Sequence, residues 1–378
     1  MKRLLTLAVL FLCCMATTFA QFSGSGSGTE NDPYLILNPI QLNQMRNFLN
    51  QSGVYFKLMA DINLTDFIEE EYPSQGWLPI GTGTIPFTGI LDGNGKTISG
   101  LVINRSSTEN VGLFAYVAGS NIKDLTIKAQ IVGLKNVGIL VGKLNGKNNF
   151  SNINIEGNLQ GSDNVGGLIG TGGGSGWHDN NKCDNIVTNV RIQATGNNIG
   201  GITGLGLNVT LTGCKVLDSF VSGNNNVGGI SGRYGHCVDC CFVGSALGNS
   251  YVGGISGNYC GIIRSYALGT ISASGDYVGG LIGSELLNDG NTESYFCGTV
   301  SGKNYVGGIA GKCDFLTMSY ANAIVKGESK VGGICGYHDM STISRCVYYG
   351  PSLYASEGEI ARILGAGSVD VGEMGTNN

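Results

Sequence analysis

The stretch YVGGISG at residues 251–257 has eight close counterparts elsewhere in the chain, and together they decide the fold. Each copy combines a β-branched residue, one or two glycines and a second apolar residue. The branched residues stand at positions 111, 137, 165, 199, 227, 252, 278, 306 and 331, so neighbouring copies lie 25 to 34 residues apart. A period of roughly 20 to 50 residues is typical of a stacked array, in which each unit buries its apolar face against its neighbours. We interpret the glycines as turn residues, because glycine takes a positive φ without steric cost.

Each repeat also carries a short segment of alternating character. Aligned on this segment, the units read DLTI from Asp124, NINI from Asn152, NVRI from Asn189, GCKV from Gly213, CCFV from Cys240, RSYA from Arg264, ESYF from Glu293, MSYA from Met318 and RCVY from Arg345. The second position is apolar or small and the third is polar or aromatic, which predicts a strand with one face inward. Parallel coils of such strands would make an all-β solenoid of about ten coils.

The composition allows a large buried core, and the first residues predict export. The 378 residues are 42% hydrophobic and 13% charged. Residues 1–20 are interpreted as a signal peptide, because a basic start and an apolar stretch precede a small-x-small site, which places cleavage between Ala20 and Gln21. That stretch is shorter than the roughly 20 residues of a membrane-spanning helix, so we expect a secreted or outer-surface protein without a membrane span. The net charge of −5 argues against a nucleic-acid partner.

Composition divides the rest of the chain into four parts. Residues 21–29 are expected to be a Gly/Ser linker, and residues 30–90 a cap over the first open sheet edge. Within this cap we predict one short helix at 39–51, a strand at 55–64 and an acidic loop at 69–71. The repeat region, 91–350, opens on a DGNG turn at 92–95. In the terminal segment, 351–378, Ser356 and Glu359 predict a capping-box helix that ends near Leu364 and precedes a loose tail from Gly365.

Ten cysteines follow the predicted leader, and we expect most of them to be buried thiols. At the second tetrad position cysteine alternates with serine and aliphatic residues (Cys214, Cys241, Cys346), so it behaves as a small apolar filler. The segment from His236 to Cys241 resembles a metal site, but no second CxxC or histidine pair completes a zinc set, so we expect no metal. Pairing of Cys237 with Cys240 or Cys260 is the alternative.

The repeats resemble a known family. YVGGLIG and YVGGISG, returning periodically, are similar to the GLUG-motif repeats of exported bacterial surface proteins, which also occur beside the catalytic domain of immunoglobulin A-cleaving metallopeptidases. GSGTENDPYLI from Gly26, YFKLMADINL from Tyr55 and FTGILDGNGKTISGL from Phe87 look like the amino-terminal part of the same proteins. The resemblance covers residues 26–350 and implies a right-handed parallel β-helix of the pectate-lyase-like kind. It implies no reaction, because one fold hosts many functions.

Motifs for catalysis are missing from the sequence. A zinc peptidase of the resembling group needs HExxH, and none of the three histidines lies in that pattern. A polysaccharide lyase or glycosidase needs carboxylates gathered on one face. The acidic residues of the repeats do not share a repeat position: Asp218, Asp239, Asp276 and Glu293. We therefore expect a non-enzymatic protein without a cofactor, with a lyase or glycosidase as the alternative.

The outward third position of the tetrads is the first candidate for binding. Aromatic residues gather there in the carboxy-terminal half: Phe242, Tyr266, Tyr295 and Tyr320. A parallel change occurs before the glycines, where Tyr251, Tyr277 and Tyr305 replace earlier asparagines. Stacked like residues stabilise parallel coils, and exposed rings also form a platform for sugar rings or a protein partner. The sequence leaves both interpretations open.

The second candidate is the longest repeat, whose extra residues, 171–182, include Trp177, His178 and Asp179. Insertions in solenoids form loops on one face, often the binding face, and a loop that covers a seam fits equally well. These features together predict an adhesin-like protein that binds a glycan or a host or extracellular-matrix protein.

Overall fold

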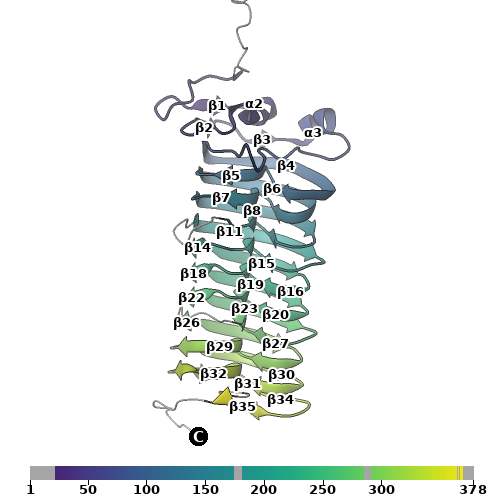
Figure 1. Ribbon diagram of the computed structural model, residues 1–378, viewed down its shortest axis with the longest axis vertical. Coiled ribbons are helices and arrows are strands. Elements are labelled where there is room, and N and C mark those ends of the chain that lie inside the picture. Colours follow the sequence, from purple (N-terminus) through teal and green to yellow (C-terminus); the bar gives the residue numbers. More distant parts are fainter. Residues whose placement is uncertain (1–21, 174–180, 285–290, 364, 366, 369–378) are drawn as a thin grey trace, which may run out of the picture.

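The computed structural model describes residues 22–173, 181–284, 291–363, 365 and 367–368, so the predicted signal peptide lies outside the described residues. The chain forms one elongated stack whose coils follow each other along the long axis in sequence order (Figure 1). Ladders between successive coils are parallel, as β16 (Asn225–Gly228) with β20 (Ser250–Gly253) and β19 (Cys241–Gly248) with β23 (Tyr266–Ala273) illustrate. The prediction of an all-β parallel solenoid is confirmed.

Long strands that bend at the corners build the first coils. They are β4 (Ile90–Val111), β6 (Asn121–Gly138), β8 (Asn149–Gly161) and β11 (Asn181–Ala194). The predicted DGNG turn is one such corner within β4: Asn94 has a φ of 51°, and β6 is the parallel partner on both sides of it. The chain therefore turns there without forming a hairpin.

Shorter strands complete the coils, and each pairs with its equivalent in the next coil. Those carrying the motif's valine or its equivalent are β9 (Val165–Gly166), β12 (Ile199–Gly200), β16, β20, β24 (Val278–Gly279), β28 (Asn304–Gly307), β31 (Ser329–Gly332) and β35 (Ile360–Ala361). Those that follow are β5 (Phe114–Ala118), β7 (Val141–Asn145), β10 (Ile169–Thr171), β13 (Thr203–Leu205), β17 (Ser231–Arg233), β21 (Ser256–Asn258), β25 (Ile282–Ser284), β29 (Ala310–Thr317), β32 (Cys335–Ser344) and β36 (Gly367–Ser368).

Two further sets complete the later coils. The first contains β14 (Val209–Thr212), β18 (His236–Val238), β22 (Gly261–Ile263) and β26 (Asn291–Thr292). The second contains β15 (Lys215–Ser222), β19, β23, β27 (Tyr295–Ser301), β30 (Tyr320–Gly327), β33 (Val347–Tyr348) and β34 (Ser352–Ala355).

The motif glycines are required by close approach, which corrects their interpretation as positive-φ residues. A Cβ on Gly254 would overlap the carbonyl oxygen of Gly280 in the next coil, and one on Gly257 would overlap the backbone of Asn226 in the previous coil. The positive φ belongs instead to the residue before the branched one, such as Asn226 at 56°. The motif therefore lets backbone pack on backbone, and its branched residue is buried in all nine copies of the motif: Val111, Val137, Val165, Ile199, Val227, Val252, Val278, Val306 and Val331.

The cap contains more helix than predicted. Helix α2 (Pro39–Gln44) and the 3-10 turn η1 (Met45–Phe48) occupy the predicted helix, and Asn38 Oδ1 caps it by accepting from Gln41 N at 3.0 Å. A second helix, α3 (Thr65–Glu71), replaces the predicted acidic loop, because Ile68 and Phe67 pack against the core. No helix among the described residues is long and apolar enough to cross a membrane.

The predicted linker is also packed into the cap. Phe22 is 5% exposed, and its ring lies 4.7 Å from that of Tyr34 in β1 (Tyr34–Ile36). The predicted strand at 55–64 is divided into β2 (Tyr55–Leu58) and β3 (Ile62–Asn63). These elements and both helices lie at one end of the stack (Figure 1).

The opposite end differs from its prediction. Strands β34, β35 and β36 continue the parallel sheet through the segment where a capping helix to Leu364 and a loose tail from Gly365 were expected. The helix prediction is wrong for the described residues of this segment. Pairing of Val331 with Ile360 shows that the segment adds a further coil.

Candidate functional site

The outward row predicted from the tetrads exists, but two of its members differ from the prediction. From coil to coil it contains Thr126, Asn154, Val187, Lys215, Cys241, Tyr266, Tyr295, Tyr320 and Val347. Phe242 pairs with Ala267 and is fully buried, so its prediction as a ligand-binding residue is wrong. Arg191 also lies outside this row, paired with Phe220.

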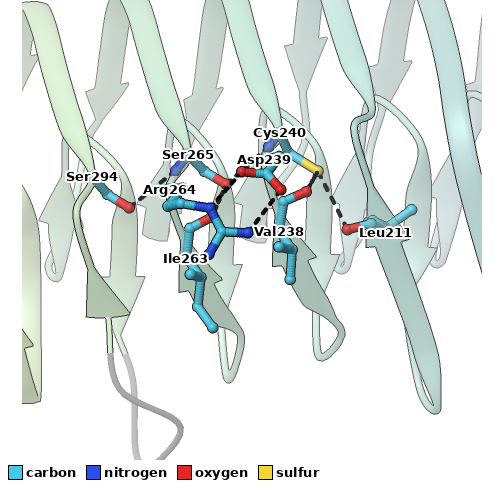
Figure 2. A network of polar contacts seen from close by, with 8 residues as sticks. All are labelled: Leu211, Val238, Asp239, Cys240, Ile263, Arg264, Ser265 and Ser294. Carbon is cyan, nitrogen blue, oxygen red and sulfur yellow. Dashed lines mark hydrogen bonds and ion pairs between the residues drawn. The ribbon is translucent and has the colours of Figure 1, made fainter.

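A left-handed corner two residues earlier fixes the observed register. The corner residue has a φ between 45° and 63° in every coil: Asp124, Asn152, Asn185, Gly213, Asp239, Arg264, Glu293, Met318 and Arg345. Arg264 donates to both carboxylate oxygens of Asp239 at 2.7 and 2.8 Å, so two corners are also joined by an ion pair (Figure 2). This contact holds the pKa of Asp239 below its ordinary value.

The residue after the corner points inward. It explains why the observed register in this coil differs by one residue from the predicted one, so that Cys241 and not Phe242 stands in the outward row. The backbone N–H of Cys240 donates to Ser265 Oγ at 3.0 Å, and the N–H of Ser265 donates to Ser294 Oγ at 3.1 Å (Figure 2). Cys240 is therefore the inward equivalent of Ser265, where Cys241 was predicted. Since this tetrad begins with two cysteines, the alternation of the sequence alone does not show which of them points inward.

The tyrosines of the outward row stack as a ladder. Tyr266 and Tyr295 have ring centroids 4.8 Å apart, and Tyr295 and Tyr320 have centroids 5.0 Å apart, with planes within 4° of parallel. Both faces of the Tyr295 ring are therefore covered, which leaves ring edges and hydroxyl groups for outside contacts. Tyr266 also shares a side-chain hydrogen bond with Cys241, which raises the pKa of Tyr266.

Exposed apolar side chains extend this ladder toward the last coil. Tyr320 is 43% exposed, Val347 beside it is 42% exposed, and Tyr349 on the same face is 70% exposed. We call Tyr266, Tyr295, Tyr320, Val347 and Tyr349 the aromatic strip. Contiguous exposed apolar surface of this kind is typical of interaction sites.

A second ladder follows the left-handed residues before the motif. In the first half, asparagine amides link successive coils, as when Asn164 Nδ2 donates to Asn136 Oδ1 at 2.7 Å and Asn198 Nδ2 to Asn164 Oδ1 at 2.8 Å. In the second half, Tyr277 stacks 4.6 Å from Tyr305, whose hydroxyl accepts from Lys330 Nζ at 2.8 Å. Both halves connect neighbouring coils, so this ladder serves the stability of the stack.

Trp177, His178 and Asp179, the second predicted binding set, lie outside the described residues. The oversized repeat that contains them enters β11 at Asn181, where Asn181 Oδ1 accepts from Asn148 Nδ2 at 2.8 Å. Their role stays a prediction.

The cysteines of the described residues form no disulfide, and eight of the ten are buried. Cys214, Cys240 and Cys346 occupy the inward position after the corner, with Cys240 in place of the predicted Cys241. Two pairs of sulfur atoms lie close together: those of Cys313 and Cys335 are 3.0 Å apart, and those of Cys237 and Cys260 are 3.7 Å apart. Among the described residues, no three histidine, cysteine or acidic side chains are placed to hold a metal ion.

Comparison with known proteins gives partial matches. No protein-family model matches the chain. The chain is 33% identical over 162 residues, 39% of its length, to a protein named as a Gly-rich membrane protein of Evansella cellulosilytica, and 39% identical over 124 residues, 32% of its length, to halomucin of Haloquadratum walsbyi. The matches span 18% and 1% of those two proteins. A crystal structure of a protein assigned as an immunoglobulin A1 protease from Bacteroides ovatus aligns over 91% of this chain and 81% of its own, with 19% identity and a TM-score of 0.39.

Proposed function

We propose that the protein is a non-enzymatic binding protein that acts outside the cytoplasm and contacts a protein partner through the aromatic strip. The observation that carries this proposal is the exposure of Tyr320, Val347 and Tyr349 on one face, beside the stacked rings of Tyr266 and Tyr295. Tyrosine is enriched in protein interfaces because its ring buries a large apolar area while its hydroxyl group keeps a hydrogen bond.

The stacking geometry favours a protein partner over a sugar at this strip. A sugar ring binds aromatic side chains through their faces, and both faces of Tyr295 are covered by its neighbours. Ring edges and apolar side chains such as Val347 are complementary to the mixed apolar and polar surface of a protein.

An extracytoplasmic location is supported by two observations. The leader sequence predicts export and cleavage near Ala20. The two sequence relatives are named a Gly-rich membrane protein and halomucin, which supports such a location. We propose a secreted or outer-surface protein with an adhesin-like role.

The experiment is a binding screen of the full chain against purified collagen, fibronectin, laminin and mucin. A double variant, Tyr320→Ser with Tyr349→Ser, removes the exposed end of the strip, and Tyr354→Ser replaces an exposed tyrosine on β34 as the matched control. We expect at least one protein to bind the wild type, about tenfold or more weakly to the double variant, and equally to the control. Equal binding by the wild type, the double variant and the control would contradict the proposal. So would the absence of binding to all four purified proteins.

A further inference from the structure

A groove runs across the first coils on the face that carries the aromatic strip further along. Two adjoining depressions of about 340 and 310 Å³ share Glu156, Gly157 and Asn158 as lining residues, so together they form one channel. The channel crosses five strands, β4, β6, β8, β11 and β15. Four inter-strand steps of about 4.8 Å give it a length of roughly 19 Å.

Three rows of residues build this groove. The floor is a row of inward or small residues, Leu101, Ala129, Gly157 and Val190, which pair from coil to coil. The rows on either side point outward and form the walls. One wall contains Lys128, Glu156 and Asn189, and the other contains Gln130, Asn158, Arg191 and Phe220.

The amides of the walls are available to a ligand. Elsewhere in the same strands, amides are paired between coils: Asn152 Nδ2 donates to Asp124 Oδ1 at 2.9 Å, and Asn185 Nδ2 donates to Asn152 Oδ1 at 3.3 Å. The side chains of Gln130, Asn158 and Asn189 have no such bond to any described residue. The groove therefore contains amide donors and acceptors that form no hydrogen bonds between the coils.

Charge and shape indicate the ligand. Two cations, Lys128 and Arg191, and two carboxylates, Glu156 and Asp218, line the groove, so its formal charges cancel. Lys128 Nζ lies 2.8 Å from Glu156 Oε2, and the Arg191 guanidinium lies 4.6 Å from the centre of the Phe220 ring. Neither Arg191 nor Asp218 has an ion-pair partner within the described parts of the chain.

The strands beneath the groove are paired on both sides, as β8 is with β6 and β11. No backbone edge of these strands is therefore free to add a peptide strand, so a ligand in the groove must be bound by side chains. Amides that both donate and accept match hydroxyl groups, and the exposed Val102, at 41%, offers an apolar surface for the C–H face of a sugar ring.

We propose that this groove binds a neutral oligosaccharide that lies along the solenoid axis. The proposal goes beyond the protein-binding strip and uses different residues. Both carboxylates are exposed to water, whereas the general acid of a glycosidase needs a shielded carboxyl group. Binding, without cleavage, is therefore the role inferred for Glu156 and Asp218.

The test is calorimetric titration of the full chain with cellohexaose, xylohexaose, mannohexaose, chitohexaose and, as the charged comparison, hexagalacturonate. We expect at least one neutral hexasaccharide to bind with a Kd below about 1 mM. Asn158→Ala and Arg191→Ala should each weaken that binding about tenfold. Asn154→Ala is the matched control, because Asn154 lies outward on the same strand and outside the groove.

Three results would overturn the proposal: no neutral hexasaccharide binds, hexagalacturonate binds most tightly, or Asn158→Ala behaves like Asn154→Ala. Mass spectrometry of the sugar after the titration shows whether the groove only binds it or also cleaves it. Cleavage that Asn158→Ala abolishes would contradict both the non-enzymatic part of the proposed function and the role of binding without cleavage inferred for Glu156 and Asp218. Loss of protein binding at the strip would leave the groove unaffected.

Discussion

The ring of Tyr295 lies parallel to that of Tyr266 within 3°, with the two centroids 4.8 Å apart, and Tyr320 covers its other face. This ladder links three successive coils through their outward side chains. Tyr295→Ala would remove two stacking contacts, each contributing about 0.5–1.5 kcal/mol beyond burial, so we expect a loss of about 1–3 kcal/mol. Tyr295→Phe keeps the stack and should change stability by less than about 0.5 kcal/mol. Urea unfolding measures both, and equal losses for the two variants would contradict the role of stacking.

The observed register separates Phe242 from the tyrosines it was predicted to join. Phe242 is fully buried, and its ring fills the space where a Cβ on Gly229 would lie. Phe242→Ala should therefore cost about 3–5 kcal/mol, as for other buried phenylalanines. Tyr320→Ala, on the exposed side, should cost about 1 kcal/mol. Thermal unfolding of both variants tests the register, and a smaller loss for Phe242→Ala than for Tyr320→Ala would show that it is wrong.

The asparagine ladder predicts different effects of alanine and glycine. Asn164 combines a φ of 57° with two amide hydrogen bonds to its neighbours in the ladder. Asn164→Gly loses only the hydrogen bonds, at a cost of about 1–3 kcal/mol. Asn164→Ala also places a Cβ at a left-handed position, which adds about 1 kcal/mol. Chemical denaturation should rank wild type above glycine and glycine above alanine, and alanine equal to or above glycine would contradict the role of φ.

Stability should fall at alkaline pH because of the tyrosine ladders. Burial raises the pKa of Tyr277 and Tyr295 above their ordinary value of 10.0. A raised pKa in the folded state means that this contribution is complete below pH 10 and is lost as the pH rises through the folded value. Melting temperatures between pH 8 and pH 11.5 should fall less steeply in the double variant Tyr277→Phe with Tyr295→Phe. An identical slope would contradict these shifts.

Thiol reactivity tests how the cysteines are distributed. Cys297 is exposed, and burial raises the pKa of Cys346 to about 11, so Cys297 should be the fast-reacting thiol of the described residues at pH 8. Titration with a thiol reagent in guanidinium should then count ten thiols in protein that lacks the leader. A count lower by two would reveal a disulfide, for which Cys313 with Cys335 and Cys237 with Cys260 are candidate pairs.

The fold was predictable because one constraint repeats in every coil. The branched residue at the start of the motif, such as Val252, recurs nine times, the equivalent of Gly257 eight times and the equivalent of Gly254 seven times, so the period can be recognised despite local variation. The register was less predictable where neighbouring residues both fit. Cys240 and Cys241 are both small, and only the left-handed Asp239 determines which one points inward.

The candidate sites were predicted in part. Three tyrosines of the strip follow the repeat and were found from their spacing. Val347 lies at the outward position of the last tetrad but was passed over because it is not aromatic, and Tyr349 lies beyond the tetrad. The groove was missed because Glu156, Arg191 and Asp218 occupy different repeat positions. They come together because two outward rows flank one floor row, as Glu156 and Asn158 flank Gly157, and because the register between β11 and β15 shifts beside Arg191.

The most direct test of the central claim is a two-by-two binding measurement by biolayer interferometry. The partner protein found in the screen and the best neutral hexasaccharide are each titrated against the variant Tyr320→Ser with Tyr349→Ser and against Asn158→Ala. The account predicts that the tyrosine variant loses about tenfold in protein binding and none in sugar binding, and that Asn158→Ala shows the reverse. If either variant loses binding to both ligands, or if neither variant loses binding to any ligand, the account of two separate recognition surfaces on one solenoid face is contradicted.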